Sequence, residues 1–375
     1  KKYNLNKSLE LHKKASELIP LGSQTFSKSY IQYPMNNAPK FVDRAEGCYF
    51  YDVDGNKYID LVSSLAAIIL GYCDKDVDSA VIRQLKKGTI YSLPHHLEVE
   101  LAERIVKLSP NAEQVRFGKN GSDATTGAIR LARAITKKER VAVCGYHGWH
   151  DWFIASTTKN LGIPKAVSEL THSFIYNDIS SLEKELESYP NEFAAVILEP
   201  ANVIMPENDF LVNVKELTKK HGALLIFDET VTGFRYSLGG AQEKFKVTAD
   251  LVTYGKALAN GYPISALAGP KEYMKHMENI FFSFTFGGEA LSLAASCATL
   301  DKLVELDVPK VIARRGERFK ESLIKLVSYN EMDAFCSISG DPSWFFILFK
   351  DIENITSWEI KTLYMQEMLR RGVLS

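Results

Sequence analysis

Residues 223–235 read ALLIFDETVTGFR and residues 250–257 read DLVTYGKA, and these two stretches decide the fold. Each contains a short apolar run, which predicts a buried strand. The first run leads into Asp228 and the second into Lys256. A carboxylate and an amine at the ends of buried strands cost free energy unless they have partners there. The two stretches therefore predict buried strands whose ends carry a polar site.

Two interpretations of this pair are open. The pair could be an ordinary salt bridge at the edge of a sheet. Alternatively, it could serve pyridoxal phosphate, which requires both groups. A lysine amine forms the Schiff base, and a carboxylate keeps the pyridine nitrogen protonated so that the ring acts as an electron sink. The surrounding residues decide between the two.

The surrounding motifs resemble those of the class III aminotransferases of fold type I. Residues 223–235 resemble the family's LLIxDEVxTGFR segment, and residues 250–263 match its Schiff-base lysine motif. The resemblance runs from about Leu18 to the last residue, and the glutamate-1-semialdehyde aminomutases are the subgroup that it resembles most. It implies a pyridoxal-phosphate enzyme in which Lys256 holds the cofactor and Asp228 faces its ring nitrogen.

Composition is that of an ordinary globular protein. The 375 residues are 24% charged and 46% apolar, with a net charge of −1, so nothing indicates nucleic acid or an anionic membrane surface as a partner. The longest apolar stretch, residues 61–70, is too short to span a bilayer. The N-terminal residues lack a signal-peptide core. The five cysteines show no paired spacing, which predicts reduced thiols in a cytoplasmic protein.

The order of elements predicts an α/β fold. From about residue 75 to residue 300, helical segments alternate with short apolar strands, most clearly at residues 140–144 and 194–198. This alternation predicts a mostly parallel sheet with helices on both faces. The resemblance implies, in addition, a smaller α+β domain.

Three segments are expected along the chain. Residues 1–60 are predicted to form an N-terminal part of the small domain, with an amphipathic helix from Ser8 to Ile19 and a β-hairpin over residues 49–60. Residues 61–300 are predicted to form the large cofactor-binding domain, and residues 301–375 the C-terminal small domain. Because the family usually continues with further strands and a closing helix, we expect this last domain to be incomplete at residue 375.

A seat for the cofactor phosphate is predicted at residues 118–125, which read GKNGSDAT and open a helical run. Small and polar residues before a helix can be a simple N-cap. They can also form an anion seat from free backbone N–H groups and the helix dipole. The segment resembles the family's NSGTEAxxxAxRLAR motif, which favours the second interpretation and implies that Gly121 and Ser122 bind phosphate.

Residues 146–151 read YHGWHD. The spacing of His147 and His150 could suggest a metal, but such a zinc site requires a helix and further ligands, so we predict no metal. The segment resembles the family's YHGxxD motif, whose aromatic residue lies against the pyridoxal ring. The resemblance therefore implies that Tyr146 stacks on the ring and that His147 belongs to the cofactor site.

Three further positions follow from the resemblance. Glu199, before Pro200, matches the family's EP pair and is implied to support the cofactor site, although a purely structural glutamate is the alternative. Thr230 is implied to pack against the other face of the ring. Where the aminomutases carry an asparagine near the cofactor's phenolic oxygen, this chain has Ile204, and Asn202 is a possible substitute.

Residues 282–289 read FSFTFGGE and occupy the family's GTLSGNP region. The resemblance implies that Thr285 donates to the phosphate bound by the neighbouring subunit, and hence a homodimer with shared active sites. A glycine-rich turn before a helix over residues 290–304 is the alternative. The TFGGE version is more similar to class III enzymes of surface polysaccharide or amino-sugar assembly.

The substrate pocket departs from the aminomutase pattern. Lys28 stands where that subgroup has a carboxylate-binding arginine, and Leu65 stands where it has a tryptophan. Lysine lacks the bidentate fork that makes arginine selective for carboxylates. Lys28 is thus either a substrate contact or a solvated surface lysine. These departures favour a sugar-like or phosphorylated carbonyl compound as the acceptor.

The sequence accordingly predicts a class III aminotransferase that moves an amino group from an amino-acid donor to a small carbonyl acceptor. The alternative is a glutamate-1-semialdehyde 2,1-aminomutase, which moves the amino group within one molecule. A third interpretation is a non-catalytic protein that keeps the fold, and the intact Asp228 and Lys256 argue against it.

Overall fold

The computed structural model describes residues 3–375, and the chain divides into two compact units. The larger unit contains Asp76–Arg318 and Gly340–Phe345. The smaller unit contains the chain up to Lys75 together with Phe319–Ser339 and Phe346–Ser375. The division thus falls after residues 75 and 318, whereas the sequence predicts boundaries at 60 and 300.

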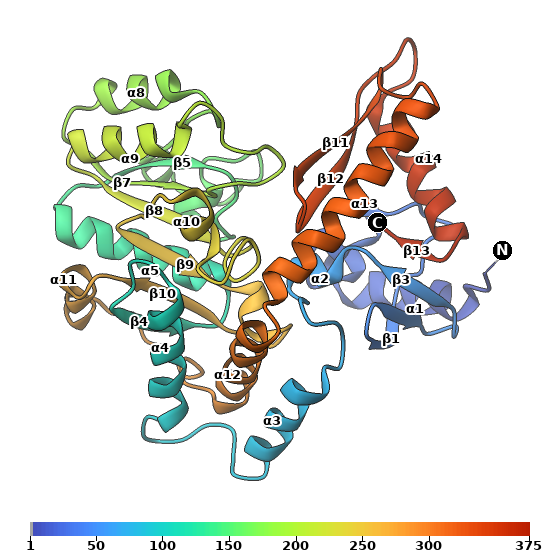
Figure 1. The fold of residues 1–375 in the computed structure, drawn as a ribbon, viewed down its shortest axis with the longest axis horizontal. Coiled ribbons are helices and arrows are strands. Elements are labelled where there is room, and N and C mark those ends of the chain that lie inside the picture. Colours follow the sequence, from blue (N-terminus) through green and yellow to red (C-terminus); the bar gives the residue numbers. More distant parts are fainter. Residues whose placement is uncertain (1–2) are drawn as a thin grey trace. The chain divides into compact units, whose positions relative to one another are not determined.

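The larger unit is built on a seven-stranded sheet with the strand order β4-β10-β9-β8-β7-β5-β6 (Figure 1). Its strands are β4 (Gln114–Gly118), β5 (Arg140–Cys144), β6 (Thr171–Ser173), β7 (Phe193–Leu198), β8 (Leu224–Glu229), β9 (Leu251–Tyr254) and β10 (Ser265–Gly269). Strands β6, β5, β7, β8 and β9 are parallel, and β10 runs antiparallel to both of its neighbours. The predicted mostly parallel α/β sheet is therefore confirmed.

Helices cover both faces of this sheet. Figure 1 shows α5 (Gly121–Thr136) on one side and α8 (Ile179–Ser188) with α9 (Phe210–Lys220) on the other. Helix α5 connects β4 to β5 and so runs along the sheet towards β6, whereas α8 and α9 connect β6 to β7 and β7 to β8 in the opposite direction. Because connections between parallel strands are right-handed, helices that run in opposite directions along the sheet lie on opposite faces. Alternate strand residues accordingly face α5 and form a buried core with it, including Val141, Val143, Ala195, Ile197, Leu224, Ile226, Leu251 and Leu267.

The larger unit contains further helices, several of which are short. They are α3 (Lys75–Leu85), α4 (His96–Leu108), α6 (Asp151–Ile154), α7 (Lys165–Ser168), α10 (Gly240–Phe245), α11 (Lys271–Met274), α12 (Ala290–Glu305) and the 3-10 helices η4 (Lys256–Ala259) and η5 (Lys275–Asn279). Helix α13 (Val308–Tyr329) begins in the larger unit and ends in the smaller one.

The smaller unit combines the two ends of the chain. Its four-stranded sheet has the order β1-β2-β3-β13. The strands are β1 (Val42–Glu46), β2 (Tyr49–Asp52), β3 (Lys57–Asp60) and β13 (Val373–Leu374). Strands β2 and β3 pair antiparallel, which confirms the predicted hairpin, and β13 adds parallel to β3. Phe50, Tyr58 and Leu369 form its buried core with Ala38.

The helices of the smaller unit agree with the sequence. Helix α1 (Asn6–Leu18) is the predicted N-terminal helix, and α14 (Ser357–Arg370) precedes β13. The short helices η1 (Pro20–Gly22), η2 (Phe26–Lys28), η3 (Tyr30–Gln32) and α2 (Ser63–Ala66) lie between α1 and residue 75. Strands β11 (Cys336–Asp341) and β12 (Trp344–Phe349) form a separate hairpin. Within residues 3–375, no helix has the length and apolar character needed to cross a membrane.

Candidate active site

Asp228 and Lys256 lie at the ends of adjacent parallel strands. Asp228 is the fifth residue of β8, and Lys256 follows the end of β9 by two residues. The register of the pair places Asp228 opposite Thr253. Because the carboxyl ends of parallel strands meet at one edge of a sheet, both charged groups belong to that edge. The strand-end positions expected from the sequence are those observed.

The Asp228 carboxylate is buried and accepts four hydrogen bonds. Its Oδ1 accepts from the backbone N–H and the hydroxyl of Thr230, at 3.1 and 2.6 Å, and from the Thr253 hydroxyl at 3.1 Å. Its Oδ2 lies 2.8 Å from Nδ1 of His147. Burial alone would raise the pKa of Asp228, but the hydrogen bond and charge of His147 and the Thr230 donors hold that pKa below its ordinary value.

His147 connects Asp228 to the neighbouring part of the sheet. Its ring is buried, with Nδ1 at Asp228 and Nε2 3.1 Å from the carbonyl oxygen of Cys144 at the end of β5. A carbonyl oxygen and a carboxylate both accept hydrogen bonds. The imidazole therefore bridges the end of β5 and the Asp228 carboxylate on β8. The sequence indicates His147 and Asp228 as separate candidates, and the structure brings them into contact.

Lys256 has an unusual backbone and an unusual environment. Its φ of 42° lies in the left-handed region, which non-glycine residues adopt uncommonly. Burial lowers the pKa of its amine, and Arg235 acts in the same direction, whereas the charges of Asp228 and Glu199 oppose the shift. A lysine amine with a lowered pKa is a better nucleophile at neutral pH.

The N-terminus of α5 forms a cradle of backbone N–H groups. Asp123 caps the helix, since its Oδ2 accepts from the N–H groups of Lys119 and Asn120, each at 2.8 Å. Among the described residues, no acceptor takes the N–H groups of Gly121 and Ser122, the first two residues of the helix. The end of a 16-residue helix with free N–H groups suits an anion.

Glycines allow close packing around this helix start. A Cβ on Gly121 would lie 3.1 Å from the Thr230 methyl group, and a Cβ on Gly148 would overlap with the side chain of Ser122. The Ser122 hydroxyl accepts from the Trp149 N–H at 3.1 Å, which leaves its own proton to donate. The structure thus places Gly121, Ser122 and Thr230 together, although they come from α5 and from the end of β8.

Tyr146 presents an open aromatic face. Its side chain is 61% exposed, and its ring meets Phe153 edge to face, with centroids 5.6 Å apart. Its backbone N–H donates to Oε2 of Glu199 at 3.0 Å. An aromatic ring that is largely exposed can stack on a flat cofactor.

Glu199 is buried directly after β7. Its Oε2 accepts from Tyr146 and, at 2.7 Å, from the amide of Asn202. Burial raises the pKa of Glu199, and Asp228 raises it further. Asn202, the possible substitute for the missing aminomutase asparagine, thus holds Glu199, whereas Ile204 is about half exposed.

Two further predicted residues belong to other segments of the chain. Thr285 belongs to an exposed segment between η5 and α12. A contact that the sequence does not indicate joins this segment to the cradle, since Glu289 pairs with Lys119 at 3.0 Å. Lys28 ends η2 in the smaller unit and is exposed, with no ion pair to any residue from 3 to 375.

These residues fit pyridoxal phosphate. The fit comes from the free N–H groups at the start of α5, the close approach of Gly148 to Ser122 and the buried Asp228 with its four donors. The open Tyr146 ring and the Lys256 amine with its lowered pKa complete it. Thr253 completes the arrangement and was not indicated by the sequence. Thr253 could have been found from its register opposite Asp228, once two parallel neighbours are assumed.

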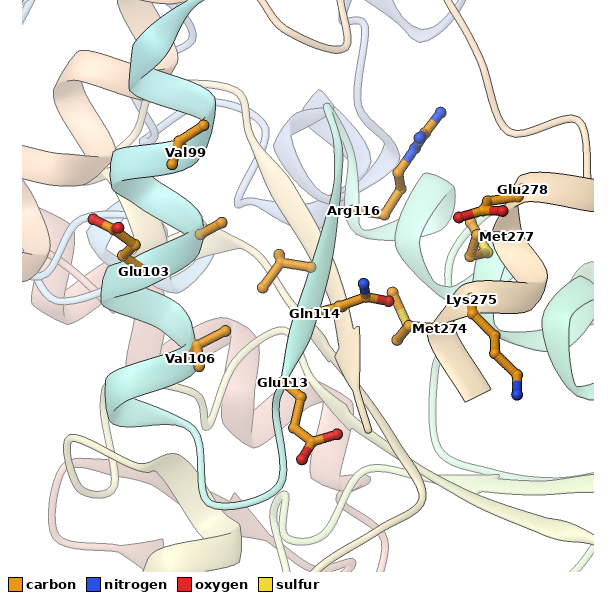
Figure 2. A pocket seen from close by; sticks show the side chains of 12 residues that line it. Val99, Glu103, Val106, Glu113, Gln114, Arg116, Met274, Lys275, Met277 and Glu278 are labelled. Atoms are coloured by element: carbon orange, nitrogen blue, oxygen red, sulfur yellow. The ribbon is translucent and has the colours of Figure 1, made fainter. Parts of the chain in front are cut away.

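A separate groove of about 480 Å³ lies between α4, β4 and the segment from α11 to η5. Figure 2 shows Val99, Glu103 and Val106 on α4 at one side of it and Met274, Lys275, Met277 and Glu278 at the other. None of the candidate site residues lines this groove.

Comparison with known proteins agrees with this geometry. A family model described as aminotransferase class-III matches residues 30–341. The 3-aminobutyryl-CoA aminotransferase of Cloacimonas acidaminovorans is 38% identical, over 99% of this chain and 90% of that protein. The glutamate-1-semialdehyde 2,1-aminomutase of Hyperthermus butylicus is 38% identical, over 87% of this chain and 80% of that protein. The solved pyridoxal-phosphate form of the FumI protein of Sphingopyxis sp. MTA144 is similar at a TM-score of 0.91 and 27% identity, covering 99% and 89% of the two chains.

Proposed function

Because this chain belongs to the class III aminotransferases, a family of pyridoxal-phosphate enzymes, we propose that it transfers an amino group from an amino acid to the carbonyl group of a different molecule. The observation that carries the proposal is the pairing of Asp228 with His147 at the strand edge that also holds Lys256. A purely structural pair would not need a lysine whose pKa is lowered by burial beside it.

Each residue has a proposed task. Lys256 would hold the cofactor through Nζ, and the same amine would move the proton between the donor's α-carbon and the cofactor's C4′. Asp228 keeps the ring nitrogen protonated, and His147 keeps Asp228 ionised. Tyr146 and Thr230 pack against the two ring faces. When bound, the cofactor supplies an electron sink for the broken C–H bond.

The phosphate has its own set of partners. Gly121 and Ser122 bind it through the N–H groups and hydroxyl at the start of α5. Thr285 binds it from the neighbouring subunit, so the active unit that we propose is a homodimer with shared sites, in the cytoplasm.

Transfer between two molecules is favoured over transfer within one. An aminomutase has to retain its intermediate, and this chain has Lys28 and Leu65 where the aminomutases have an arginine and a tryptophan. The relative with the fuller coverage is named an aminotransferase. The acceptors that we propose are sugar-like or phosphorylated ketones and aldehydes of surface polysaccharide assembly. The name of that relative adds an acyl-CoA carbonyl compound to those worth testing.

Glutamate-1-semialdehyde 2,1-aminomutase activity is the second candidate. The observation in its favour is the similarity to the Hyperthermus butylicus enzyme of that name. The two candidates differ in what they release. A transaminase frees a keto acid before the acceptor binds, whereas an aminomutase has no need of a second substrate.

A donor and acceptor screen separates these candidates. Purified enzyme is mixed with single amino acids, and the cofactor absorbance and released keto acid are measured before any acceptor is added. We expect at least one amino acid to give a stoichiometric half-reaction and the full reaction to show ping-pong kinetics. If no amino acid does so, while glutamate semialdehyde is converted to aminolevulinate, the transaminase proposal is wrong.

A further inference from the structure

We propose that Glu199 is a positioning residue that sets Tyr146 against the cofactor ring, acting through the Tyr146 backbone. The proposal rests on the proposed function, because it assumes that a flat cofactor lies on Tyr146. It goes beyond that function by giving a task to a buried carboxylate that binds neither substrate nor phosphate. Three features of the chain around Glu199 carry it.

The first feature is the direction of the hydrogen bonds. Both donors to Glu199, the Tyr146 N–H at 3.0 Å and the Asn202 amide at 2.7 Å, go to the same oxygen, Oε2. The bond to Tyr146 crosses from the end of β7 to the end of β5. The carboxylate therefore fixes the loop after β5 at the residue that we propose to stack on the cofactor.

The second feature is the close approach of Gly145 to the Glu199 carboxylate. Gly145 has a φ of 105°, and a Cβ there would lie 2.6 Å from Oε2 of Glu199. The carboxylate thus occupies the space that any side chain at position 145 would need. It holds the backbone immediately before Tyr146 as well as the Tyr146 N–H itself.

The third feature is the Tyr146 ring. It meets the Phe153 ring edge to face, and Tyr146 is 61% exposed. The side chain alone does not determine how far the ring reaches over the site. Its height follows from the position of its backbone, which is what Glu199 fixes.

The geometry also separates this role from a charge effect. Since both hydrogen bonds use one oxygen, a glutamine at position 199 can accept both through its single carbonyl oxygen. Holding the Tyr146 backbone therefore requires a side chain of this length with a hydrogen-bond acceptor, and it does not require a negative charge. Burial and Asp228 raise the pKa of Glu199, which is consistent with a carboxyl group that works in either protonation state.

The test is a double-mutant cycle of Glu199→Ala and Tyr146→Ala. Cofactor affinity is measured by titration, and the induced circular dichroism of the bound cofactor reports the packing of its ring. Loss of stacking is expected to weaken cofactor binding about tenfold in either single variant. In the double variant the second change should add less than about twofold, because Glu199 acts through Tyr146.

One conservative variant and several control variants accompany the double-mutant cycle. Glu199→Gln should restore the affinity and the dichroism. Asp250→Ala removes another carboxylate that accepts a backbone N–H, that of Leu225 at 2.8 Å, at the opposite end of β8. It should lower the melting temperature without changing the dichroism. Gly145→Ala should reproduce the loss, whereas Gly162→Ala, at a φ of 90° with open space around it, should not.

Two results would overturn the proposal. One is additive losses in the cycle, which would mean that Glu199 acts independently of Tyr146. The other is a Glu199→Gln variant as weak as Glu199→Ala, which would mean that charge is what counts. Either result could occur in an active transaminase that binds pyridoxal phosphate, whereas failure of the proposed function would show as no cofactor binding or no amino transfer in the unaltered enzyme.

Discussion

At the scale of single residues, the four hydrogen bonds to Asp228 determine what the site can do. An anion buried this completely is stable only because His147, Thr230 and Thr253 all donate to it. Their arrangement leaves a fixed negative charge at the strand edge, ready to stabilise a positive group. Such preorganised charges contribute most where water is excluded.

Replacing Asp228 by asparagine tests this charge. We expect Asp228→Asn to fold and to bind cofactor, but to lose on the order of 10²–10³-fold in kcat, because a neutral amide stabilises a protonated ring nitrogen far less. Single-turnover kinetics with a saturating donor are the measurement. Thr253→Val, which removes one donor at 3.1 Å and keeps the charge, is the control and should lose less than about tenfold. Wild-type turnover in Asp228→Asn would contradict the assignment.

The buried amine of Lys256 is expected to cost stability. Replacing a buried polar group by an apolar one of similar size removes a desolvation penalty, so Lys256→Met should stabilise the cofactor-free protein by about 1 kcal/mol, or about 1–2 °C in Tm. Thermal unfolding without cofactor is the measurement. A lower Tm for Lys256→Met would mean that the amine is satisfied in the folded protein.

The same burial predicts a pH dependence. The folded-state pKa of Lys256 lies below its unfolded-state value, so between the two values the unfolded chain binds more protons, and stability rises with pH. The penalty is therefore full below the folded-state pKa and disappears near about pH 10, the pKa of free lysine. The stability advantage of Lys256→Met should shrink as the pH is raised towards that value. An advantage that stays constant with pH would contradict this origin.

Sequence alone reaches part of this site. Asp228 and Lys256 each follow a recognisable apolar run, and Gly121 and Ser122 precede a helical one. The contact between His147 and Asp228 could not be predicted from residues, because it depends on β5 and β8 flanking the same strand, β7. That order is a non-local property of the sheet.

At the scale of helices and strands, the sequence pattern predicts an element well where its residues are uniformly buried or alternate regularly between buried and exposed. The all-buried strands β7 and β8 and the hairpin of β2 and β3 follow from their sequences. Pattern fails for α2, where Ser64 and Leu65 have φ values of 50° and 58°. Residues in the left-handed region there are held by surrounding structure and not by their own preferences.

Helix α13 contains a glycine whose role is a close approach. Gly316 lies in its interior, where alanine would gain about 1 kcal/mol from helix propensity. A methyl group at this position would, however, overlap with the carbonyl oxygen of Pro342, between β11 and β12. Because backbone has to move to relieve that overlap, we expect Gly316→Ala to destabilise the protein by about 1–3 kcal/mol net.

Chemical denaturation of the two variants checks this. Arg315→Ala, an exposed neighbour on the same helix, is the matched control and should change the free energy of unfolding by less than about 0.5 kcal/mol. If Gly316→Ala proves as stable as Arg315→Ala or more stable, then α13 does not approach Pro342 this closely.

At the scale of the whole molecule, the assignment of segments to units depends on pairings that no local pattern reveals. Val373 pairs with Ile59 in parallel, so the last strand of the chain completes a sheet begun near its start. The seven-stranded sheet likewise inserts the late strand β10 between β4 and β9. The resemblance to a known family anticipates a small domain made from both ends, whereas composition and periodicity do not.

The shared active site that we propose belongs to this scale as well, and subunit mixing tests it. A Lys256→Ala chain and a Thr285→Ala chain are each expected to be nearly inactive at limiting cofactor. If Thr285 serves the partner's site, a mixed dimer carries both lesions in one site and leaves the other intact. Random mixing should then recover about a quarter of the wild-type activity, since half of the dimers are mixed and each has one working site. If Thr285 serves its own subunit, every site keeps one lesion and mixing recovers nothing. Pairing Lys256→Ala with Asp228→Asn is the control: both residues belong to the same subunit's sheet, so that mixture should stay inactive in either case.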